Sequence, residues 1–367
     1  MEQDHGVQSR SHSRPTAVSI YDIARRANVS PSTVSRALEN HPRIGAETRK
    51  RIQELAREMD YVPNAVARSL IANRTWTIGM VLATIADPFM GRVVEGVEHV
   101  AIEAGFNVFV STSQNDPQRE IAVMKMLKQR RVDGIIVIAS HLFDQYPRLF
   151  YRSKTPVIVI NEQKPPSDAM HFVSVDDIRE AYRAVEHLLK LGHSRIGYIG
   201  VTNRPKSNQH RLQGYREALQ AASIPIDPAL IIVPEETQDH MRIGEISLEP
   251  LLTAGATAVF CYNDAVAIGL LSACSKRGLA VPEDLSIIGF DDIDIAAYTV
   301  PPLTTVRQPR FQLGQRAMLM LLAILDGQEP ENEIVPGELV IRQTTARPAS
   351  DQARRQAHIP LRPVDVR

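Results

Sequence analysis

The sequence predicts an α/β protein with an all-α helix-turn-helix head and a body of two lobes built on parallel β-sheets. Three observations support this fold class. Two short amphipathic helical patterns follow each other within Ser19–Asn40, and apolar strand-like runs alternate with amphipathic helical stretches from Trp76 onward. The length of 367 residues also exceeds what one hydrophobic core usually covers, so two or three domains are expected.

The head begins with two helical patterns joined by Ala27-Asn28-Val29. Apolar residues recur at helical spacing on both sides of this turn: Tyr21, Ile23, Ala24 and Ala27 before it, and Val34, Ala37 and Leu38 after it. Asn28 tolerates the positive φ of a tight turn, Ser30 can cap the second helix, and Pro31 suits its first position. In such a unit the second helix enters the DNA major groove, so Pro31, Ser32 and Arg36 are expected to face base edges. Helix pairs that do not bind DNA share this pattern, so DNA binding has to be judged from the rest of the chain.

A third helix is expected from about Ala46 to Met59. Ile52, Leu55, Ala56 and Met59 form its buried stripe. Its first turns carry Arg49, Lys50 and Arg51, and positive charge near a helix start opposes the helix dipole. Contact with DNA phosphates would explain this placement.

The segment from Tyr61 to Arg74 predicts a short helix between the head and the body. Pro63 ends the third helix, Asn64 can cap a new one, and Val66 and Leu70 share a face at four-residue spacing. A helix shorter than about 12 residues is marginal alone in water. We therefore expect it to fold only with a partner helix and DNA present.

The body reads as repeated β-α-β units. Strands are expected at Ile78–Ala83, Val108–Ser111, Gly134–Ala139, Val157–Ile160, Ile196–Gly200, Ala258–Tyr262 and Leu285–Phe290, with helices at Gly91–Ala104, Pro117–Gln129, Asp177–Leu191, Ser207–Ala221, His240–Ala254 and Asn263–Arg277. Ligands of such sheets lie beyond the carboxyl ends of the strands. A cleft between two lobes is therefore the expected ligand site.

Polar side chains follow several of these strands: Asn161 after VIVI, Asn263 and Asp264 after AVFCY, and Asp291 and Asp292 after LSIIGF. Arg211 begins the helix that follows IGYIG, and Phe89 follows the first strand. Carboxylates, amides, a guanidinium and an aromatic face together suit a polyhydroxylated ligand such as a sugar. Asp264 or Asp292 alone would more simply cap a helix, so the argument depends on the convergence of the set.

Composition describes an ordinary globular protein with an uneven distribution of charge. Residues 1 to 74 contain 12 Lys and Arg against 8 Asp and Glu, and the remainder contains 30 against 34. A basic head on an acidic body suits a nucleic-acid module attached to another domain, although chance scatter of surface charge remains an alternative. No apolar run is long enough to span a membrane and residues 1 to 18 lack a signal-peptide core, so a cytoplasmic protein without a membrane partner is expected. Cys261 and Cys274 lie in apolar segments, where reduced packing residues are expected.

At this point the chain resembles the lactose-repressor/galactose-repressor family of bacterial transcription regulators over about Ser19 to Pro348. The segments that carry the resemblance are YDIARRANVSPSTVSRAL, AETRKRI, YVPNAVARSL, TIGMV, ADPF, HLLKLGHSRIGYIG, RLQGY, CYNDAVAIGLL, IIGFDD and PPLTTVRQP. The resemblance implies a dimeric regulator, most simply a repressor, that binds palindromic operator DNA under the control of a sugar-like effector. It implies no cofactor and no metal.

The resemblance also assigns residues to these two activities. The DNA-contact set that it implies is Tyr21, Pro31, Ser32, Thr33, Ser35, Arg36, Arg43, Thr48, Asn64, Ala67 and Leu70, in which Leu70 would enter the minor groove and kink the operator. The effector set is Phe89, Asn161, Arg211, Asn263 and Asp291. Segments near Val175 and Thr304–Gln308 would cross between the lobes, helix Pro309–Leu325 would return to the first lobe, and strand Glu338–Thr344 to the second.

Some positions depart from the family pattern, and one alternative function remains. Gly45 stands where a capping serine is usual, and His240 where many members place an aromatic ring against the sugar. The tail from Arg347 lacks a leucine heptad, which favours a homodimer over a tetramer.

A sugar-binding protein without regulatory DNA binding is the alternative function, and it shares the body but not the head. An enzyme is less consistent, because nucleotide-loop, zincin and C-x-x-C motifs are missing.

The predicted domain boundaries follow from these segments. They are a disordered arm at 1–18, a helix-turn-helix domain at 19–62, a hinge helix and linker at 63–75, an effector-binding and dimerisation body at 76–346, and a flexible tail at 347–367.

Overall fold

The computed structural model describes residues 18–61, 74–138, 155–161 and 171–349. The chain divides into two compact units between Thr75 and Trp76, and each unit is described by itself. The predictions for Asn64, Ala67, Leu70 and the rest of the hinge helix lie outside the described residues, as do those for the arm up to residue 17 and for the tail beyond residue 349. Within the described ranges, no helix is both long and apolar enough to cross a bilayer.

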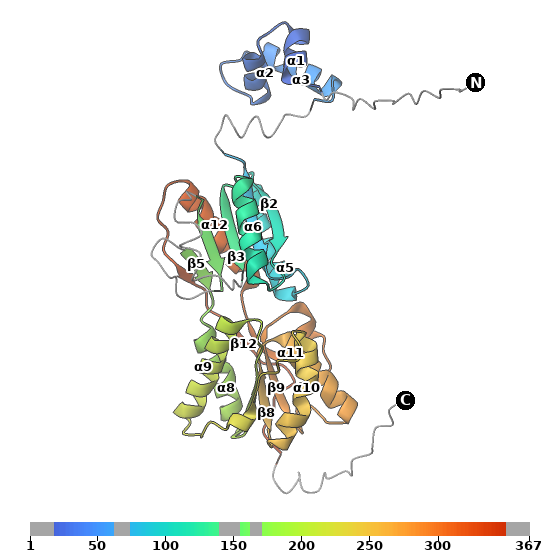
Figure 1. Ribbon diagram of the computed structural model, residues 1–367, viewed down its shortest axis with the longest axis vertical. Coiled ribbons are helices and arrows are strands. Elements are labelled where there is room, and N and C mark those ends of the chain that lie inside the picture. The colour runs from blue at the N-terminus through green and yellow to red at the C-terminus, as the bar shows by residue number, and fades with distance from the viewer. Residues whose placement is uncertain (1–17, 62–73, 139–154, 162–170, 350–367) are drawn as a thin grey trace, which may run out of the picture. The chain divides into compact units, whose positions relative to one another are not determined.

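The first unit is a bundle of helices α1 (Ile20–Ala27), α2 (Pro31–Leu38) and α3 (Ala46–Glu58), shown in Figure 1. Its buried residues come from all three helices: Ile23, Ala24 and Ala27 from α1, Val34 and Ala37 from α2, and Ile52 and Ala56 from α3. The periodicity of the sequence therefore identified the faces that meet, except that Tyr21, predicted on the apolar face of α1, is 66% exposed. Only a small core holds the three helices together.

Local caps set the angle between α1 and α2. Asn28 ends α1 in the left-handed conformation with φ of 52°, and Ser30 Oγ accepts a hydrogen bond from the Thr33 amide at 3.2 Å. At the start of α1, Asp22 Oδ2 accepts hydrogen bonds from the Ser19 amide at 3.0 Å and from the Ser19 hydroxyl at 2.6 Å, which is one half of a capping box. Gly45 precedes α3 without a side-chain cap.

The first lobe of the body is a parallel sheet covered by helices on both faces (Figure 1). Among the described residues its strands lie in the order β11-β5-β4-β3-β1-β2, and every neighbouring pair is parallel. The elements are β1 (Thr77–Leu82), α5 (Pro88–Glu103), β2 (Asn107–Thr112), α6 (Pro117–Gln129), β3 (Gly134–Ile138), β4 (Val157–Ile160), β5 (His171–Ser174), α12 (Arg310–Leu325) and β11 (Glu333–Ile334).

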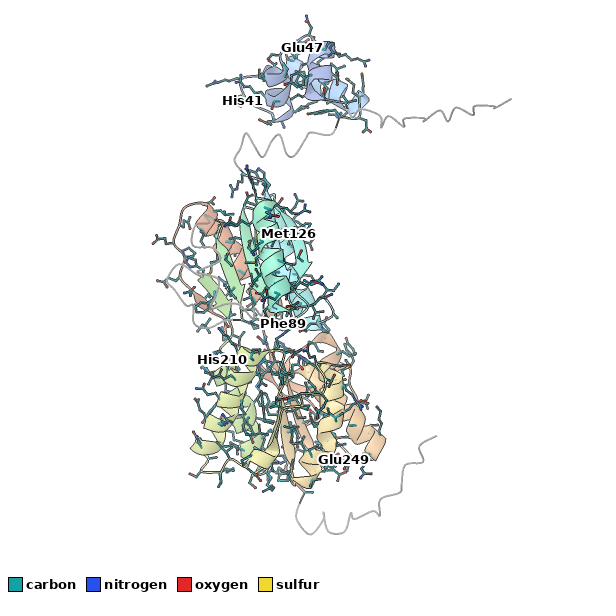
Figure 2. All side chains as sticks on the ribbon, in the orientation of Figure 1. His41, Glu47, Phe89, Met126, His210 and Glu249 are labelled. Atoms are coloured by element: carbon teal, nitrogen blue, oxygen red, sulfur yellow. The ribbon has the colours of Figure 1, made fainter. Side chains whose placement is uncertain are left out.

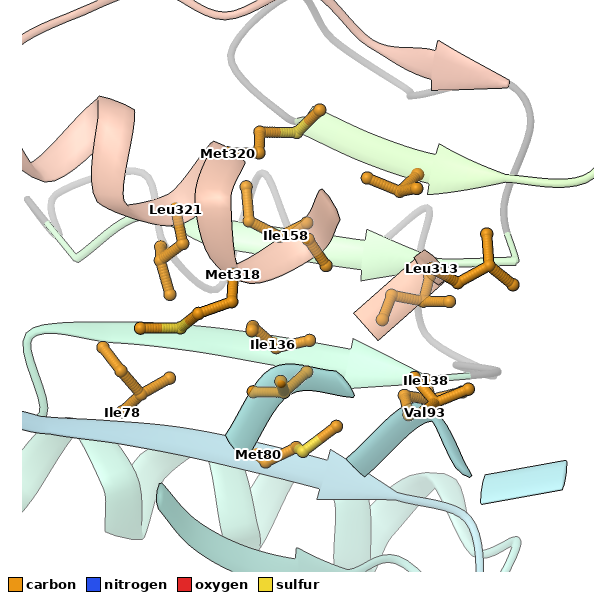
Figure 3. Close-up of a cluster of buried hydrophobic side chains, with 14 of the residues drawn as sticks. Ile78, Met80, Val93, Ile136, Ile138, Ile158, Leu313, Met318, Met320 and Leu321 are labelled. Atoms are coloured by element: carbon orange, nitrogen blue, oxygen red, sulfur yellow. The ribbon is translucent and has the colours of Figure 1, made fainter. Parts of the chain in front are cut away.

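Side chains of the central strands point alternately to the two faces of the sheet, so the same strands contribute to the core on both faces. Ile136 and Ile138 face α5 and α12, where Met318 and Leu321 pack against them (Figure 3). Ile135 and Val137 face α6 on the other side. Strands that are buried on both faces appear in the sequence as continuous apolar runs, which is why they were predicted correctly.

The second lobe repeats this architecture. Its strands lie in the order β12-β10-β9-β8-β6-β7, and β12 alone of these described strands pairs antiparallel. The elements are α8 (Asp177–Lys190), β6 (Ile196–Ile199), α9 (Pro205–Ala221), β7 (Ile231–Ile232), α10 (His240–Thr253), β8 (Ala258–Cys261), α11 (Asp264–Arg277), β9 (Ser286–Asp291), β10 (Thr304–Arg307) and β12 (Glu338–Val340), with short 3₁₀ turns at Pro228–Leu230 and Asp294–Ala297. Helices α8 and α9 cover one face, and α10 and α11 the other (Figure 1).

Neighbouring helices approach closely at glycines. A Cβ on Gly96 of α5 would lie 2.0 Å from the Phe311 carbonyl oxygen of α12. The same arrangement recurs between α8 and α9, where a Cβ on Gly214 would lie 2.2 Å from the Ile178 carbonyl oxygen. These glycines serve close backbone contact rather than turns.

The chain passes between the lobes three times within the fully described stretch 171–349: after β5, after β10 and after β11. Helix α12 therefore belongs to the first lobe although it follows the strands of the second. The prediction of an α/β body with two parallel-sheet lobes is confirmed.

Several details differ from the prediction: β10 (Thr304–Arg307) is a strand where only a crossing segment was predicted, and α5 begins at Pro88 rather than Gly91. Helix α9 begins at Pro205 rather than Ser207, because proline fits the first helical position. No strand was predicted at β5. Strand β12 ends at Val340 rather than Thr344, because threonine hydroxyls take the place of ladder contacts to β10 beyond it: the Arg342 amide donates to Thr304 Oγ1 at 3.0 Å, and the Thr304 amide donates to Thr344 Oγ1 at 2.8 Å.

Candidate functional site

The exposed face of α2 carries the residues predicted to read DNA. Ser32 and Arg36 lie four residues apart, so they share a helix face, and both are exposed, whereas Val34 and Ala37 are buried. Tyr21 of α1 is 66% exposed. Of the other predicted contacts in this unit, Arg43 is exposed, and Pro31, Thr33, Ser35 and Thr48 are half-buried.

Hydroxyl groups in and before the first turn of α2 already bond to one another. Ser30 Oγ lies 2.8 Å from both Ser32 Oγ and Thr33 Oγ1. Ser35 Oγ donates to Glu39 Oε1 at 3.3 Å. These hydroxyls would have to exchange partners to contact a base, whereas the exposed guanidinium of Arg36 is directly accessible.

The basic start of α3 has a structural explanation that the sequence did not reveal. Arg49 donates to the Ile44 carbonyl at 2.9 Å, and Arg51 donates to the Ala27 carbonyl at the end of α1 at 3.1 Å. Phosphate contact, which was predicted to explain this basic cluster, is therefore not needed to account for the position of either arginine. Lys50 is mostly exposed, at 4.0 Å from Glu54.

The body contains a pocket between its two lobes, and all five residues predicted to bind an effector line it. The first lobe contributes Asp87, Phe89, Met90 and Asn161, and Gln308 comes from the segment that crosses between the lobes. The second lobe contributes Arg204, Pro205, Lys206, Ser207, Arg211, His240, Tyr262, Asn263 and Asp291. Figure 2 marks Phe89 at the end of the first lobe that faces the second.

Arg211 is the buried centre of this pocket. Its Nε donates to Asp177 Oδ1 at 3.1 Å, its Nη1 donates to the Tyr262 carbonyl at 2.6 Å, and its Nη2 lies 3.7 Å from Asp291 Oδ1. The guanidinium carbon lies 3.8 Å from the centroid of the Phe290 ring. Burial opposes the charge of Arg211, but the two carboxylates outweigh burial and raise its pKa, so the side chain remains a fixed cation.

Asp291 occupies a constrained position at the end of β9. Its φ of 112° is unusual for a residue with a side chain, and its Oδ1 accepts a hydrogen bond from Gln308 Nε2 at 2.7 Å. Burial raises its pKa to about 7, although Arg211 acts in the opposite direction. The carboxyl group therefore gains or loses its proton near neutral pH.

Asp264 holds the loop that follows Asp291. It is fully buried, and its two oxygens accept hydrogen bonds from the Ile293 amide at 2.8 Å and from Thr305 Oγ1 at 2.5 Å. The simpler sequence reading, in which Asp264 caps the next helix, is wrong. Asn263 is the cap, because its Oδ1 accepts from the Val266 amide at 3.1 Å.

The bonds of Asn263 also fix the protonation state of His240. Since Asn263 Oδ1 is occupied as an acceptor, its Nδ2 must donate to His240 Nδ1, 3.0 Å away. His240 Nε2 then carries the proton and donates to Asn203 Oδ1 at 3.1 Å. Burial lowers the pKa of His240 to about 4, so it presents a neutral ring, which meets the Tyr262 ring in a T-shaped arrangement.

Two acceptors in the pocket have no partner among the described residues. They are Asn161 Oδ1 and Gln308 Oε1, both buried. Unpaired buried oxygens are costly, so the pocket suits a ligand that donates hydrogen bonds. Within the same part of the chain, no group of three or more histidines, cysteines or carboxylates could hold a metal ion.

Sequence reasoning missed the residues whose position depends on tertiary structure. Gln308 follows β10, which was predicted as a crossing segment rather than a strand, and Asp177 was predicted only as the start of a helix. Arg204 precedes α9 in a loop and carried no signal. Tyr262 stands directly before Asn263, and attention to the last residue of each predicted strand would have found it.

Comparison with known proteins gives matches across both units. Residues 19–64 match the model described as bacterial regulatory proteins, lacI family, and residues 185–345 match a periplasmic binding protein-like domain. The HTH-type transcriptional repressor CytR of Escherichia coli strain K12 is 35% identical over 340 residues, which cover 92% of this chain and 98% of that repressor.

Solved structures show the same similarity. A lac repressor dimer bound to operator and the anti-inducer ONPF superimposes with a TM-score of 0.81 at 28% identity, covering 90% of this chain and 100% of that one. A LacI family transcriptional regulator from Enterococcus faecium with bound ribose gives a TM-score of 0.66 at 32% identity, covering 74% of this chain and 99% of that one.

Proposed function

The chain belongs to the lacI family of bacterial regulatory proteins, and from that membership we propose that it represses transcription as a homodimer on a palindromic operator under the control of a sugar-like effector. The family fixes the coarser statement: the protein is a DNA-binding transcriptional regulator with an effector-binding body. The proposal adds that the protein is a cytoplasmic homodimer, that the operator is a palindrome, that the effector is sugar-like, and which residues contact DNA and effector. The proposed protein binds and releases its effector chemically unchanged.

The observation that carries the DNA-binding half is the pair Ser32 and Arg36 on the outer face of α2, backed by the buried Val34 and Ala37. Arg36 offers a planar fork that fits a guanine edge in the major groove. Tyr21, Pro31, Thr33, Ser35, Arg43 and Thr48 complete the proposed contact set in this unit, and Asn64, Ala67 and Leu70 complete it in the hinge.

The effector half of the proposal depends on the donor and acceptor groups of the pocket. Asn161 Oδ1 and Gln308 Oε1 accept from ligand hydroxyls, and Asp291 accepts from a further hydroxyl when ionised. Arg211 donates, Asn263 orients His240, and Phe89 provides an apolar wall. This combination suits a polyol, and a relative of this chain has been solved with ribose bound.

Coupling between ligand and DNA would depend on the angle between the lobes. Arg310, at the start of α12, donates to the Pro88 carbonyl of the first lobe at 3.3 Å and to the Asp292 carbonyl of the second at 2.7 Å. Both contacts lie one residue from a pocket wall, because Phe89 and Asp291 are their neighbours. A ligand that changes this angle alters the free energy of the hinge helices by about 1 to 3 kcal/mol, a typical allosteric coupling.

Selection of bound sequences from random DNA tests the first half of the proposal. We expect a palindrome with identical half-sites. Arg36→Ala should then weaken binding by about 1 to 3 kcal/mol and relax one base pair in each half-site. Arg25→Ala, which removes an exposed arginine of α1, is the control. Uniform weakening over all sequences would show that Arg36 contacts only phosphate.

A thermal-shift screen of sugars and their derivatives tests the second half. A ligand at 100 times its dissociation constant should add about 2.7 kcal/mol to the stability of the body. Asp291→Ala should then remove the ligand response while the unliganded protein still binds the selected operator. A response that survives this substitution would place the effector elsewhere.

A further inference from the structure

Arg204 is a pocket residue that the proposed sugar-binding set does not use. It lies immediately before α9, it is 7% exposed, and it lines the pocket together with Lys206 and Ser207 of the first turn. Its Nη1 donates to the amide oxygen of Asn115 in the first lobe and to the Asn203 carbonyl at 3.1 Å.

The charge of Arg204 is not balanced by an anion in the described part of the chain. Both of its acceptors are neutral, and no described carboxylate lies within ion-pair distance of it. Arg211 differs, because Asp177 and Asp291 flank it. Asp87 also lines the pocket, but its Oδ1 is engaged with the Phe89 amide at 2.9 Å. A buried cation without a counter-ion is unfavourable, so an anionic partner from outside would relieve a cost already present.

The amino end of α9 adds a second source of positive potential beside Arg204. Helix α9 has 17 residues with Pro205 in its first turn, and no side chain caps it. The other helices that begin at this pocket are capped by their own residues: α5 by Asp87, α10 by Asp239 and α11 by Asn263. The partial positive charge of a long helix is therefore directed toward the pocket beside Arg204.

Resting on the effector role proposed above, we propose that the effector carries an anionic group, a phosphate monoester or a carboxylate, which binds to Arg204 and the amino end of α9. The hydroxyl groups of the same ligand bind to Asn161, Gln308 and Asp291. The acidic Asp291 and the unpaired oxygens would repel an anion, so the two kinds of group have separate places in the pocket. The ligand class is thus a sugar phosphate or a sugar acid.

Inorganic phosphate is the first probe, because it needs no knowledge of the sugar. Its effect on the melting temperature of the full chain is compared with that of sodium chloride at equal ionic strength. We expect phosphate to stabilise the wild type, and Arg204→Gln to weaken apparent phosphate binding at least about tenfold, since a charge-assisted contact is lost. Arg204→Lys should retain part of the binding. Arg216→Gln, an exposed position on the same helix, should bind phosphate as the wild type does.

Two results of this experiment would overturn the proposal. One is a phosphate response of the same size in Arg204→Gln and the wild type, and the other is no response in the wild type. Folding of the variant is checked by its melting temperature in chloride, which we expect to be unchanged or higher because a buried charge has been removed.

Matched ligands distinguish the two anionic groups, and calorimetry provides the readout. Glucose is compared with glucose 6-phosphate and gluconate, and ribose with ribose 5-phosphate. A preference of about 10- to 100-fold for an anionic member, abolished in Arg204→Gln, would support the proposal and identify its anion. A neutral sugar that binds as tightly as its anionic partners would overturn it while leaving the effector site intact. A different result would refute the effector role of the pocket itself, namely an unchanged ligand response in Asp291→Ala.

Discussion

Replacing Asp291 with asparagine should change how the stability of the body depends on pH. Asp291 is 5% exposed, and burial raises its pKa from the ordinary value of 3.8 to about 7. Asparagine has nearly the same shape and can still accept the hydrogen bond from Gln308 Nε2, but it cannot titrate. The comparison therefore isolates one ionisation.

The sign follows from which state holds the proton. Between pH 3.8 and about 7 the folded protein keeps a proton on Asp291 that the unfolded chain releases, so raising the pH through this window lowers the free energy of unfolding. The full effect is about 4 kcal/mol, and a little over half of it falls between about pH 5 and about pH 8. Asp291→Asn lacks this loss, so its stability relative to the wild type should rise with pH.

Urea denaturation of both proteins at several pH values measures this difference. Other titrating groups contribute equally to both proteins and cancel. Asp326→Asn, at an exposed carboxylate after α12, is the control for replacing a carboxylate by an amide. A difference independent of pH would refute the raised pKa. A difference that falls as the pH rises would show that attraction to Arg211 outweighs burial.

Three further substitutions test the packing and the caps. Gly214→Ala places a Cβ 2.2 Å from a backbone oxygen of α8 and should lower the free energy of unfolding by about 2 to 3 kcal/mol. Gly91→Ala, whose Cβ would have nothing within 4 Å, should raise the free energy of unfolding by up to about 1 kcal/mol. Equal effects of the two substitutions in urea denaturation would argue against close packing at Gly214. Arg211→Met leaves two buried carboxylates without their cation and should cost about 3 to 5 kcal/mol, so an unchanged urea midpoint would contradict the ion-pair account. Ser30→Ala should cost the head about 1 kcal/mol, seen as faster hydrogen exchange in α2, while Ser32→Ala should leave exchange unchanged; equal exchange in both variants would exclude the cap.

Features that depend on a few neighbouring residues could be predicted from the sequence. The turn at Asn28 and the cap at Ser30 need only the residues beside them, and both are present as expected. The central strands β3 and β4 are buried on both faces, so their apolar runs identified them. Three of the five predicted effector residues, Asn161, Asn263 and Asp291, follow strands, and the fold gathers all five in one pocket.

Features that depend on distant partners could not be predicted in this way. Strand β10 contains adjacent threonines that look like a surface segment, but it lies between β12 and β9, and the hydroxyl of the buried Thr305 donates to Asp264, 41 positions away. Arg49 and Arg51 resemble phosphate ligands until the loop and helix end that they bond to are known. Arg204 carries no local signal, because its missing counter-ion is a property of the assembled pocket.

The order of elements along the chain bears on how the protein forms during synthesis. The helices of the head are complete once residue 58 has emerged from the ribosome, whereas the first lobe waits for α12 and β11, which end at Leu325 and Ile334. The intervening second lobe must therefore be made before the first is finished. Chains released early would carry a complete head on a body whose first lobe is unfinished, so premature termination should yield fragments that lack both the effector pocket and the proposed dimerisation body.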